Sequence, residues 1–269
     1  MAERIAFQTP DAMDFSKVFS SLCQHHNPWT IWSDFITMHA CVISIAFDRY
    51  DPMRFKERSE LFRNTAKQYS EQELTAFDSL IKITAASLNR NPRQDFLGRL
   101  YMSLDFGRRW TGQFFTPWNV AYMMAEMTVG PDADILKDRE YASICDPCCG
   151  AGCMLLAAAA AYADEEKNRV PQRDLLLVAQ DVDRIVALMC YIQLSLLGYA
   201  GYVAIGNSLT NPVTGTDLFP QIGESGELWF TPGWFAPIWD TRRQIEYIKR
   251  MTANLQTAKA FSGLEGGEG

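Results

Sequence analysis

The stretch Asp146-Pro147-Cys148-Cys149-Gly150-Ala151-Gly152 decides the fold of this chain. Residues 143–146 predict a short strand before it, and the alanine-rich residues 154–163 predict a helix after it. Glycines let the backbone turn tightly and approach a ligand closely, and the start of the helix presents free N–H groups. The stretch therefore predicts a ligand-binding loop between a strand and a helix. Taken alone, it also fits an ordinary glycine turn.

Strands and helices alternate along the chain beyond this loop. The nearly continuous apolar run 174–181 ends in an acid, as expected of a buried parallel strand. Further strands are predicted at 202–206 and 227–230, and helices at 184–197 and 241–255. This alternation predicts βαβ units and an α/β fold with a doubly wound parallel sheet.

The first part of the chain is predicted to be helical. Residues 28–47 place apolar side chains at helical spacing behind Pro28. Ser70 and Glu73 form a capping box for a helix that ends near Asn91-Pro92, and another helix is predicted over 94–105. We expect an N-terminal helical domain at 1–105, an α/β domain at 106–260 and a disordered tail at 261–269.

Composition limits the partners of the chain. It has 269 residues, 48% of them hydrophobic, with a formal net charge of -7. Such an acidic balance disfavours tight, nonspecific DNA binding, which depends on neutralising phosphates. Residues 90–109 nevertheless form a small basic segment, which also fits a solvated surface. Its arginines are Arg90, Arg93, Arg99, Arg108 and Arg109.

No targeting or membrane segment is predicted. The first residues carry early acids and no apolar run, and the apolar stretch 36–47 is too short to span a bilayer. We therefore expect a cytoplasmic protein whose seven cysteines are reduced.

Metal binding is not expected, although Cys145 and Cys148 have C-x-x-C spacing and His25 and His26 are adjacent. The glycines of the loop fit a ligand better than a metal, and no other ligand types stand beside the histidines at metal-ligand spacing. Cys145 is expected to point into the sheet as a small buried residue.

Four motifs stand in the order found in one enzyme family. Upstream of the loop, residues 112–117 read Gly-Gln-Phe-Phe-Thr-Pro; the loop itself is Asp-Pro-x-x-Gly-x-Gly; Asp181-Val182 follows one strand and Asn207-Ser208 follows the next. Over residues 94–235 the chain resembles adenine-N6 DNA methyltransferases, in particular the modification subunits of type I restriction-modification systems. The resemblance implies a Rossmann-like, S-adenosylmethionine-dependent methyltransferase domain preceded by a helical domain.

The resemblance also implies which residues bind S-adenosyl-L-methionine. Residues of the first motif would line the pocket, and those of the glycine loop would hold the methionine part. Asp181 would accept hydrogen bonds from ribose hydroxyls. Asn207 stands where the family has an acid and would contact the adenine. Asp181 also fits a helix N-cap, and Asn207 also fits a turn. The implied set is Phe114, Phe115, Thr116, Pro117, Asp146, Pro147, Gly150, Gly152, Asp181, Val182, Asn207 and Ser208.

The chain departs from the family at the catalytic motif. The family has [DN]-P-P-[FYW] after its fourth strand, where it accepts hydrogen bonds from the amino group of a flipped adenine. This sequence has no such motif; residues 231–234, Thr-Pro-Gly-Trp, follow the predicted strand 227–230 and stand nearest to its position. We predict Thr231, Pro232 and Trp234 as a degenerate catalytic motif; a purely structural turn is the alternative.

The sequence thus indicates a DNA methyltransferase of the adenine-N6 type that is weakly active or inactive alone. DNA is the expected substrate, bound weakly, and sequence choice is expected to come from a specificity or other partner subunit or from the N-terminal helices. The alternative is a catalytically silent, cofactor-binding subunit that acts in assembly or regulation. A methyltransferase for protein, RNA or a small molecule is disfavoured by the order of the motifs.

Overall fold

The structure is a computed structural model, described for residues 9–47, 51–104, 114–130, 133–137, 139–164 and 166–265, with side chains to residue 253. Four residues of the sequence predictions, Arg108, Arg109, Gly112 and Gln113, lie outside this part of the chain. So does residue 105, and the domain boundary placed there stays a prediction.

The N-terminal part is helical, as predicted. It contains α2 (Pro10–Leu22), α3 (Pro28–Phe47), α4 (Pro52–Ala66), α5 (Glu71–Arg90) and α6 (Phe96–Ser103). The capping box of α5 is confirmed, because the Ser70 hydroxyl accepts from the Glu73 backbone and the Glu73 carboxylate accepts from the Ser70 backbone. The helix predicted over 94–105 is shorter than expected and starts after the N-cap Asp95.

Helix α3 packs against α2 and α4 of the N-terminal part. It is long and apolar enough to cross a membrane, yet Ile31, Trp32, Phe35 and Ile36 on its length have no exposed surface. The Phe15 ring of α2 packs on Trp32 and Phe35 of this face, and the Phe96 ring of α6 packs on Phe15. The apolar character of α3 is thus explained by core packing.

A four-stranded sheet with the order β1-β2-β3-β6 forms the other part. Strands β1 (Ala142–Asp146), β2 (Leu175–Asp181) and β3 (Ala200–Ile205) are parallel, whereas β6 (Glu227–Phe230) is antiparallel to β3. The fold is therefore mixed α/β with a sheet that contains parallel strands. The prediction that the fourth strand is parallel is wrong.

Different elements cover the two faces of the sheet. One face packs on α8 (Cys153–Tyr162) and α10 (Arg184–Leu196), and the short α9 (Pro171–Asp174) precedes β2. The other face packs on the hairpin of β4 (Thr214–Thr216) and β5 (Phe219–Gln221), the 3-10 helix η3 (Pro232–Phe235) and the start of α11 (Pro237–Glu265). One core cluster joins the first face to α2, α3, α5 and α6, so the helices and the sheet share a core.

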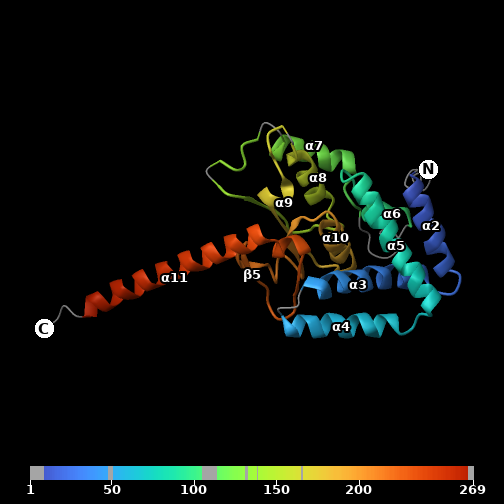
Figure 1. The fold of residues 1–269 in the computed structure, drawn as a ribbon, viewed down its shortest axis with the longest axis horizontal. Helices are drawn as coiled ribbons and strands as arrows, with labels where there is room; N and C mark the ends of the chain where they lie inside the picture. Colours follow the sequence, from blue (N-terminus) through green and yellow to red (C-terminus); the bar gives the residue numbers. More distant parts are fainter. Residues whose placement is uncertain are drawn as a thin grey trace.

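Helix α11 extends away from the body of the molecule (Figure 1). It spans 29 residues, or about 44 Å at 1.5 Å per residue, and it includes residues 261–265 of the tail that was predicted to be disordered. Residues 266–269 lie outside the description, and the disorder of the tail stays a prediction.

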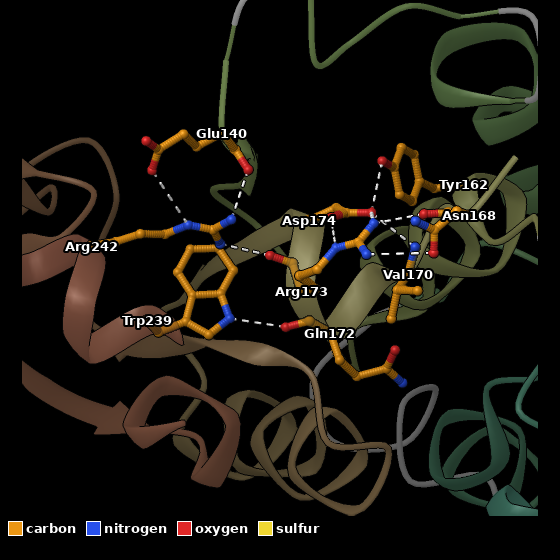
Figure 2. A network of polar contacts seen from close by, with 9 residues as sticks. All are labelled: Glu140, Tyr162, Asn168, Val170, Gln172, Arg173, Asp174, Trp239 and Arg242. Carbon is orange, nitrogen blue, oxygen red and sulfur yellow. Dashed lines mark hydrogen bonds and ion pairs between the residues drawn. The ribbon is translucent and has the colours of Figure 1, made fainter. Parts of the chain in front are cut away.

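The base of α11 is fixed by polar contacts to residues that precede β1 and β2 (Figure 2). Trp239 Nε1 donates to the Gln172 carbonyl at 2.9 Å, and Arg242 donates to the carbonyls of Arg173 and Glu140 at 2.6 and 2.7 Å. Both side chains are buried. These contacts hold α11 at the edge of the sheet where the parallel strands begin.

Strand β1 lies at the edge of the sheet, and no other strand of the described chain pairs with its outer side. Because one face of this edge strand is open, Ser143 and Cys145 are exposed, and the prediction of a buried Cys145 is wrong. Next to β1, α7 (Trp118–Val129) packs on α8 through Ala121 and Ala125.

The outer face of α7 is apolar and exposed. Val120, Met123, Met124 and Met127 recur at helical spacing and are 43%, 58%, 45% and 80% exposed. We call these four side chains the α7 stripe.

Candidate functional site

Polar residues gather where the parallel strands end. Asp146 closes β1, Asp181 closes β2, and Gly206-Asn207 follow β3. The registers place Asp146 beside Ala179 and Asp181 beside Ile205. Ligands of parallel α/β sheets bind outside the carboxyl ends of the strands, so these residues define the candidate site.

The glycine loop after β1 is held by the end of β2. Cys149 N donates to the Gln180 carbonyl at 3.0 Å, and Gly150 N donates to Asp181 Oδ2 at 2.8 Å. The loop and the acid of the next strand, which the sequence predicted at one site, are thus in direct contact.

Both loop glycines are required by the backbone. Gly150 and Gly152 have φ angles of +53° and +92°, in the left-handed region that favours glycine. A Cβ at Gly152 would lie 2.7 Å from Cys190 Sγ on α10, and one at Gly150 would lie 3.3 Å from the Phe115 ring. Helix α8 then begins without a side-chain cap, so the N–H groups of its first turn can meet a ligand.

Asp146 lies at the start of the loop with one side-chain oxygen engaged. Its Oδ1 accepts from Cys148 N at 3.1 Å, and this bond closes a turn that contains the exposed Pro147 and Cys148. Burial raises the pKa of Asp146, and the charge of Asp181 raises it further. A positively charged ligand beside Asp146 would oppose this effect by stabilising the carboxylate.

Asp181 is not the N-cap of the next helix. That role belongs to Asp183, whose Oδ1 accepts from Ile185 N and Val186 N. Asp181 instead joins the loop at Gly150 and accepts from Asp183 N at 2.9 Å. Val182, between the two acids, is 68% exposed and offers an apolar surface beside them.

The segment 114–117 lies against the loop and the start of α8. The Phe115 ring stacks on Tyr101 of α6 at a centroid distance of 5.3 Å and lies next to Gly150. Cys153 Sγ donates to the Thr116 carbonyl at 3.3 Å, and Pro117 caps α7. Phe114 is 72% exposed, so the segment presents an aromatic surface near the loop.

Asn207 forms a turn, as the alternative interpretation of the sequence had it. Its Oδ1 accepts from Leu209 N at 2.9 Å and from Thr210 N at 3.2 Å. Ser208 Oγ lies 4.0 Å from Cys148 Sγ, which joins this turn to the glycine loop. The amide nitrogen of Asn207 is the group that this turn offers to a ligand.

Sequence reasoning missed the role of Gln180. Its Nε2 donates to the carbonyls of Gly206 and Asn211 at 3.1 and 2.9 Å, and its Oε1 accepts from Val213 N at 3.2 Å. Gln180 therefore fixes the turn that carries Asn207. A buried glutamine at the end of an apolar strand was the available signal, since such a side chain needs partners.

The prediction that Thr231, Pro232 and Trp234 occupy the catalytic position is wrong. Because β6 is antiparallel to β3, it starts beside Ile205 and ends beside Tyr202. Thr231 Oγ1 donates to the carbonyls of Tyr199 and Gly201 at 2.7 and 3.1 Å, at the other end of β3. The length of β3 separates it from the candidate site, which is about 16 Å for six residues.

Residues 231–234 instead form a structural turn. Thr231 is fully buried, Pro232 begins η3, and the Trp234 ring packs on Tyr202 and Phe230 at centroid distances of 5.6 and 4.9 Å. This was the alternative interpretation of the sequence. Residues 231–234, which follow β6, therefore do not face the candidate site.

Two of the histidines have other contacts. His26 Nε2 lies 2.7 Å from Glu73 Oε1, and His39 Nδ1 lies 2.7 Å from the Phe35 carbonyl. Within the described ranges, no three His, Cys, Asp or Glu side chains are grouped as metal ligands.

Residues 94–222 match the family model described as N-6 DNA Methylase. The match covers α6, the glycine loop, strands β1 to β5 and the turn after β3. No curated protein and no solved structure was found to match the chain.

Proposed function

We propose that the chain belongs to the N-6 DNA methylase family, whose model residues 94–222 match, and that it binds S-adenosyl-L-methionine on a Rossmann-like domain. The domain would act in adenine-N6 methylation of DNA in the cytoplasm, as part of a restriction-modification system. The observation that carries the proposal is the contact between the glycine loop and the acid of the next strand, Gly150 N to Asp181 Oδ2.

The residues at this edge fit such a cofactor. The cofactor would supply an electrophilic methyl group on a positively charged sulfur. Asp146 offers a half-buried carboxylate to the positive charge of the methionine part, and Asp181 has lone pairs left for ribose hydroxyls. Val182 and Phe114 offer exposed apolar surface for a base. Pro147, Ser208 and the backbone of 115–117 complete the proposed binding set.

Methyl transfer to adenine needs a further group. An oxygen must accept hydrogen bonds from the adenine amino group in order to make its nitrogen nucleophilic, and Thr231 lies at the wrong end of the sheet for this role. Loss of one preorganised contact of this kind typically costs on the order of 100- to 1000-fold in rate. We therefore expect the isolated chain to bind cofactor and to transfer methyl groups slowly or not at all.

A second candidate function is that of a cofactor-binding subunit whose site is completed by a partner protein. The outer side of β1 and the α7 stripe favour it, because within the described residues no strand pairs with that side of β1, which leads into the glycine loop, and the stripe is exposed. A strand added next to β1 would form the second wall of the crevice at the carboxyl edge.

The test of the proposed function combines binding and transfer. Calorimetry with S-adenosylmethionine and S-adenosylhomocysteine measures binding, and tritiated-methyl transfer to DNA, RNA and protein measures activity. Transfer to DNA supports the methyltransferase; binding with no transfer to any acceptor supports the subunit. The absence of binding at millimolar ligand would refute both.

Substitutions in the α7 stripe test the proposal that the chain is a subunit, and Met53 on α4 offers a matched control. In extracts of a strain that carries the chain's native partners, Met123→Lys with Met127→Lys should abolish co-elution of the chain with a larger assembly. Met53→Lys, on α4, changes a side chain that is 73% exposed but lies elsewhere, and should leave co-elution unchanged. If the two variants co-elute with the larger assembly to the same extent, the proposal that the α7 stripe binds a partner subunit is contradicted.

A further inference from the structure

Gln193 is a buried polar residue within the mostly apolar helix α10. Its side chain has no exposed surface, so each of its hydrogen-bonding groups needs a partner inside the protein. Its Oε1 accepts from Phe96 N at 2.9 Å and from Leu97 N at 3.1 Å. Its Nε2 donates to Asp95 Oδ1 at 2.8 Å and to the Ala151 carbonyl at 2.9 Å. The amide is therefore fully satisfied.

These four bonds join two segments that are far apart in the sequence. Phe96 N and Leu97 N belong to the first turn of α6, whose amides have no partner within the helix. Ala151 lies between the two glycines of the loop. One side chain thus caps α6 and holds the centre of the loop that the proposed function assigns to the cofactor.

Asp95 adds to this connection from the start of α6. Its Oδ1 accepts from Gly98 N at 2.8 Å as well as from Gln193, and the side chain is 3% exposed. A Cβ at Gly98 would lie 2.0 Å from Asp95 Oδ2, so only glycine leaves room for this carboxylate. The position of the Gln193 amide is therefore fixed from the α6 side.

A second contact between α6 and the loop is aromatic. Tyr101 of α6 stacks on Phe115, whose ring lies against Gly150. Helix α6 therefore reaches two successive residues of the loop, Gly150 through Phe115 and Ala151 through Gln193. The loop is held by α6 on one side and by Gln180 and Asp181 of β2 on the other.

We propose that Gln193 is a positioning residue for cofactor binding. It sets the geometry of residues 150–152 and couples that loop to helix α6 of the N-terminal part. The inference rests on the proposed function, because the loop is taken to hold the cofactor. A purely structural role would affect the stability of the fold without a specific effect on ligand affinity.

Gln94 provides a matched control for Gln193. It is also a buried glutamine, 6% exposed, and its Nε2 donates to Ser87 and Asn91 while its Oε1 accepts from Arg99. None of these partners belongs to the loop. Gln94→Met and Gln193→Met therefore remove similar numbers of buried hydrogen bonds and differ in their contact with Ala151.

The experiment measures S-adenosylhomocysteine affinity and melting temperature for both variants. We expect similar losses of melting temperature, but an affinity about tenfold weaker only in Gln193→Met, since one lost hydrogen bond in a site has an effect of this order. Gln193→Glu keeps the size and the acceptor oxygen, but an ionised glutamate has no hydrogen to donate to Asp95 or Ala151, and this variant should also weaken binding. Equal affinities in Gln94→Met and Gln193→Met would overturn the proposal.

A measurement on the unmutated protein covers the case in which the variants do not fold. Hydrogen exchange should show that S-adenosylhomocysteine protects the amides of Phe96 and Leu97, which bind Gln193 and belong to α6. If the ligand binds and protects the loop but not these amides, the coupling is absent. If the unmutated protein binds no ligand at all, the proposed function fails instead.

Discussion

At the scale of single residues, two neighbouring acids have separate roles that a mutation pair can distinguish. Asp181 accepts from Gly150 N in the loop, whereas Asp183 caps α10. Asp181→Ala should weaken S-adenosylhomocysteine binding by about tenfold or more, because hydrogen bonds to charged groups contribute about 1.5–3 kcal/mol. Asp183→Ala should instead lower the free energy of unfolding by about 1 kcal/mol. Calorimetry measures the affinity and denaturant unfolding measures the stability. Weaker binding in Asp183→Ala with unchanged binding in Asp181→Ala would contradict these roles.

Asp146 predicts a pH dependence of both stability and binding. Burial, with the charge of Asp181, raises the pKa of Asp146 in the folded protein. The ionised carboxylate therefore destabilises the fold above that pKa, and this cost disappears as the pH falls through it. A cationic ligand needs the ionised form, so its affinity should fall as the pH is lowered in the same range.

The matched variant is Asp146→Asn, which keeps an acceptor for Cys148 N. At neutral pH it should raise the free energy of unfolding and weaken cofactor binding, a trade between stability and function. Its affinity should also lose the pH dependence seen in the unmutated protein. Titrations at several pH values check this, and identical profiles for the two proteins would show that another group titrates.

At the scale of elements, the direction of β6 predicts that Thr231 affects stability and not chemistry. Thr231→Val keeps the shape but leaves the carbonyls of Tyr199 and Gly201 without their hydroxyl donor. The expected loss is about 1–3 kcal/mol in the free energy of unfolding, with unchanged cofactor affinity. A variant of normal stability that has lost cofactor binding would contradict the placement of Thr231.

Rebuilding the family's catalytic motif at this turn should fail. In Thr231→Asn with Gly233→Pro, a Cβ at position 233 would lie 2.6 Å from the Tyr199 backbone. The variant should be destabilised and should gain no methyl transfer to adenine in the tritium assay. A gain of transfer would mean that the turn can reach the cofactor.

The positions of the elements were largely predictable, but the direction of one strand was not. Proline at helix starts, the capping box at Ser70 and the apolar run before Asp181 carry local signals that tertiary packing does not override. The sequence Glu-Leu-Trp-Phe at 227–230 has no such signal for direction. The chain enters β6 at Glu227, beside Ile205 at the carboxyl end of β3, so β6 runs back along β3. This reversal moved the expected catalytic residues to the wrong edge.

The candidate site was predictable in part for a similar reason. Residues that end parallel strands meet at one edge by geometry, and Asp146, Gly150 and Asp181 were found there. Gln180 and Gln193 were missed because their roles depend on backbone groups of other segments, which the sequence does not display. Both are buried polar side chains in apolar elements, and that feature was the available signal.

At the scale of the whole molecule, the chain should bind DNA weakly when alone. Its net charge is -7, and of the basic segment Arg90 pairs with Asp11 and Arg99 with Gln94. Few arginines are left for phosphates, so we expect a dissociation constant in the range of nonspecific binding, about 10⁻⁴–10⁻⁶ M, with a shallow salt dependence. Fluorescence anisotropy at several salt concentrations checks this. Tight binding that survives Arg90→Ala with Arg93→Ala would contradict it.

The measurement that tests the central claim most directly is calorimetric titration of the unmutated protein with S-adenosylmethionine, beside Gly150→Val. Gly150 has a φ of +53° and lies against Phe115, so a β-branched residue there should distort the loop while the fold persists. The account predicts saturable one-site binding by the unmutated protein and none by the variant. No binding by the unmutated protein at millimolar ligand, or equal binding by both, would contradict it.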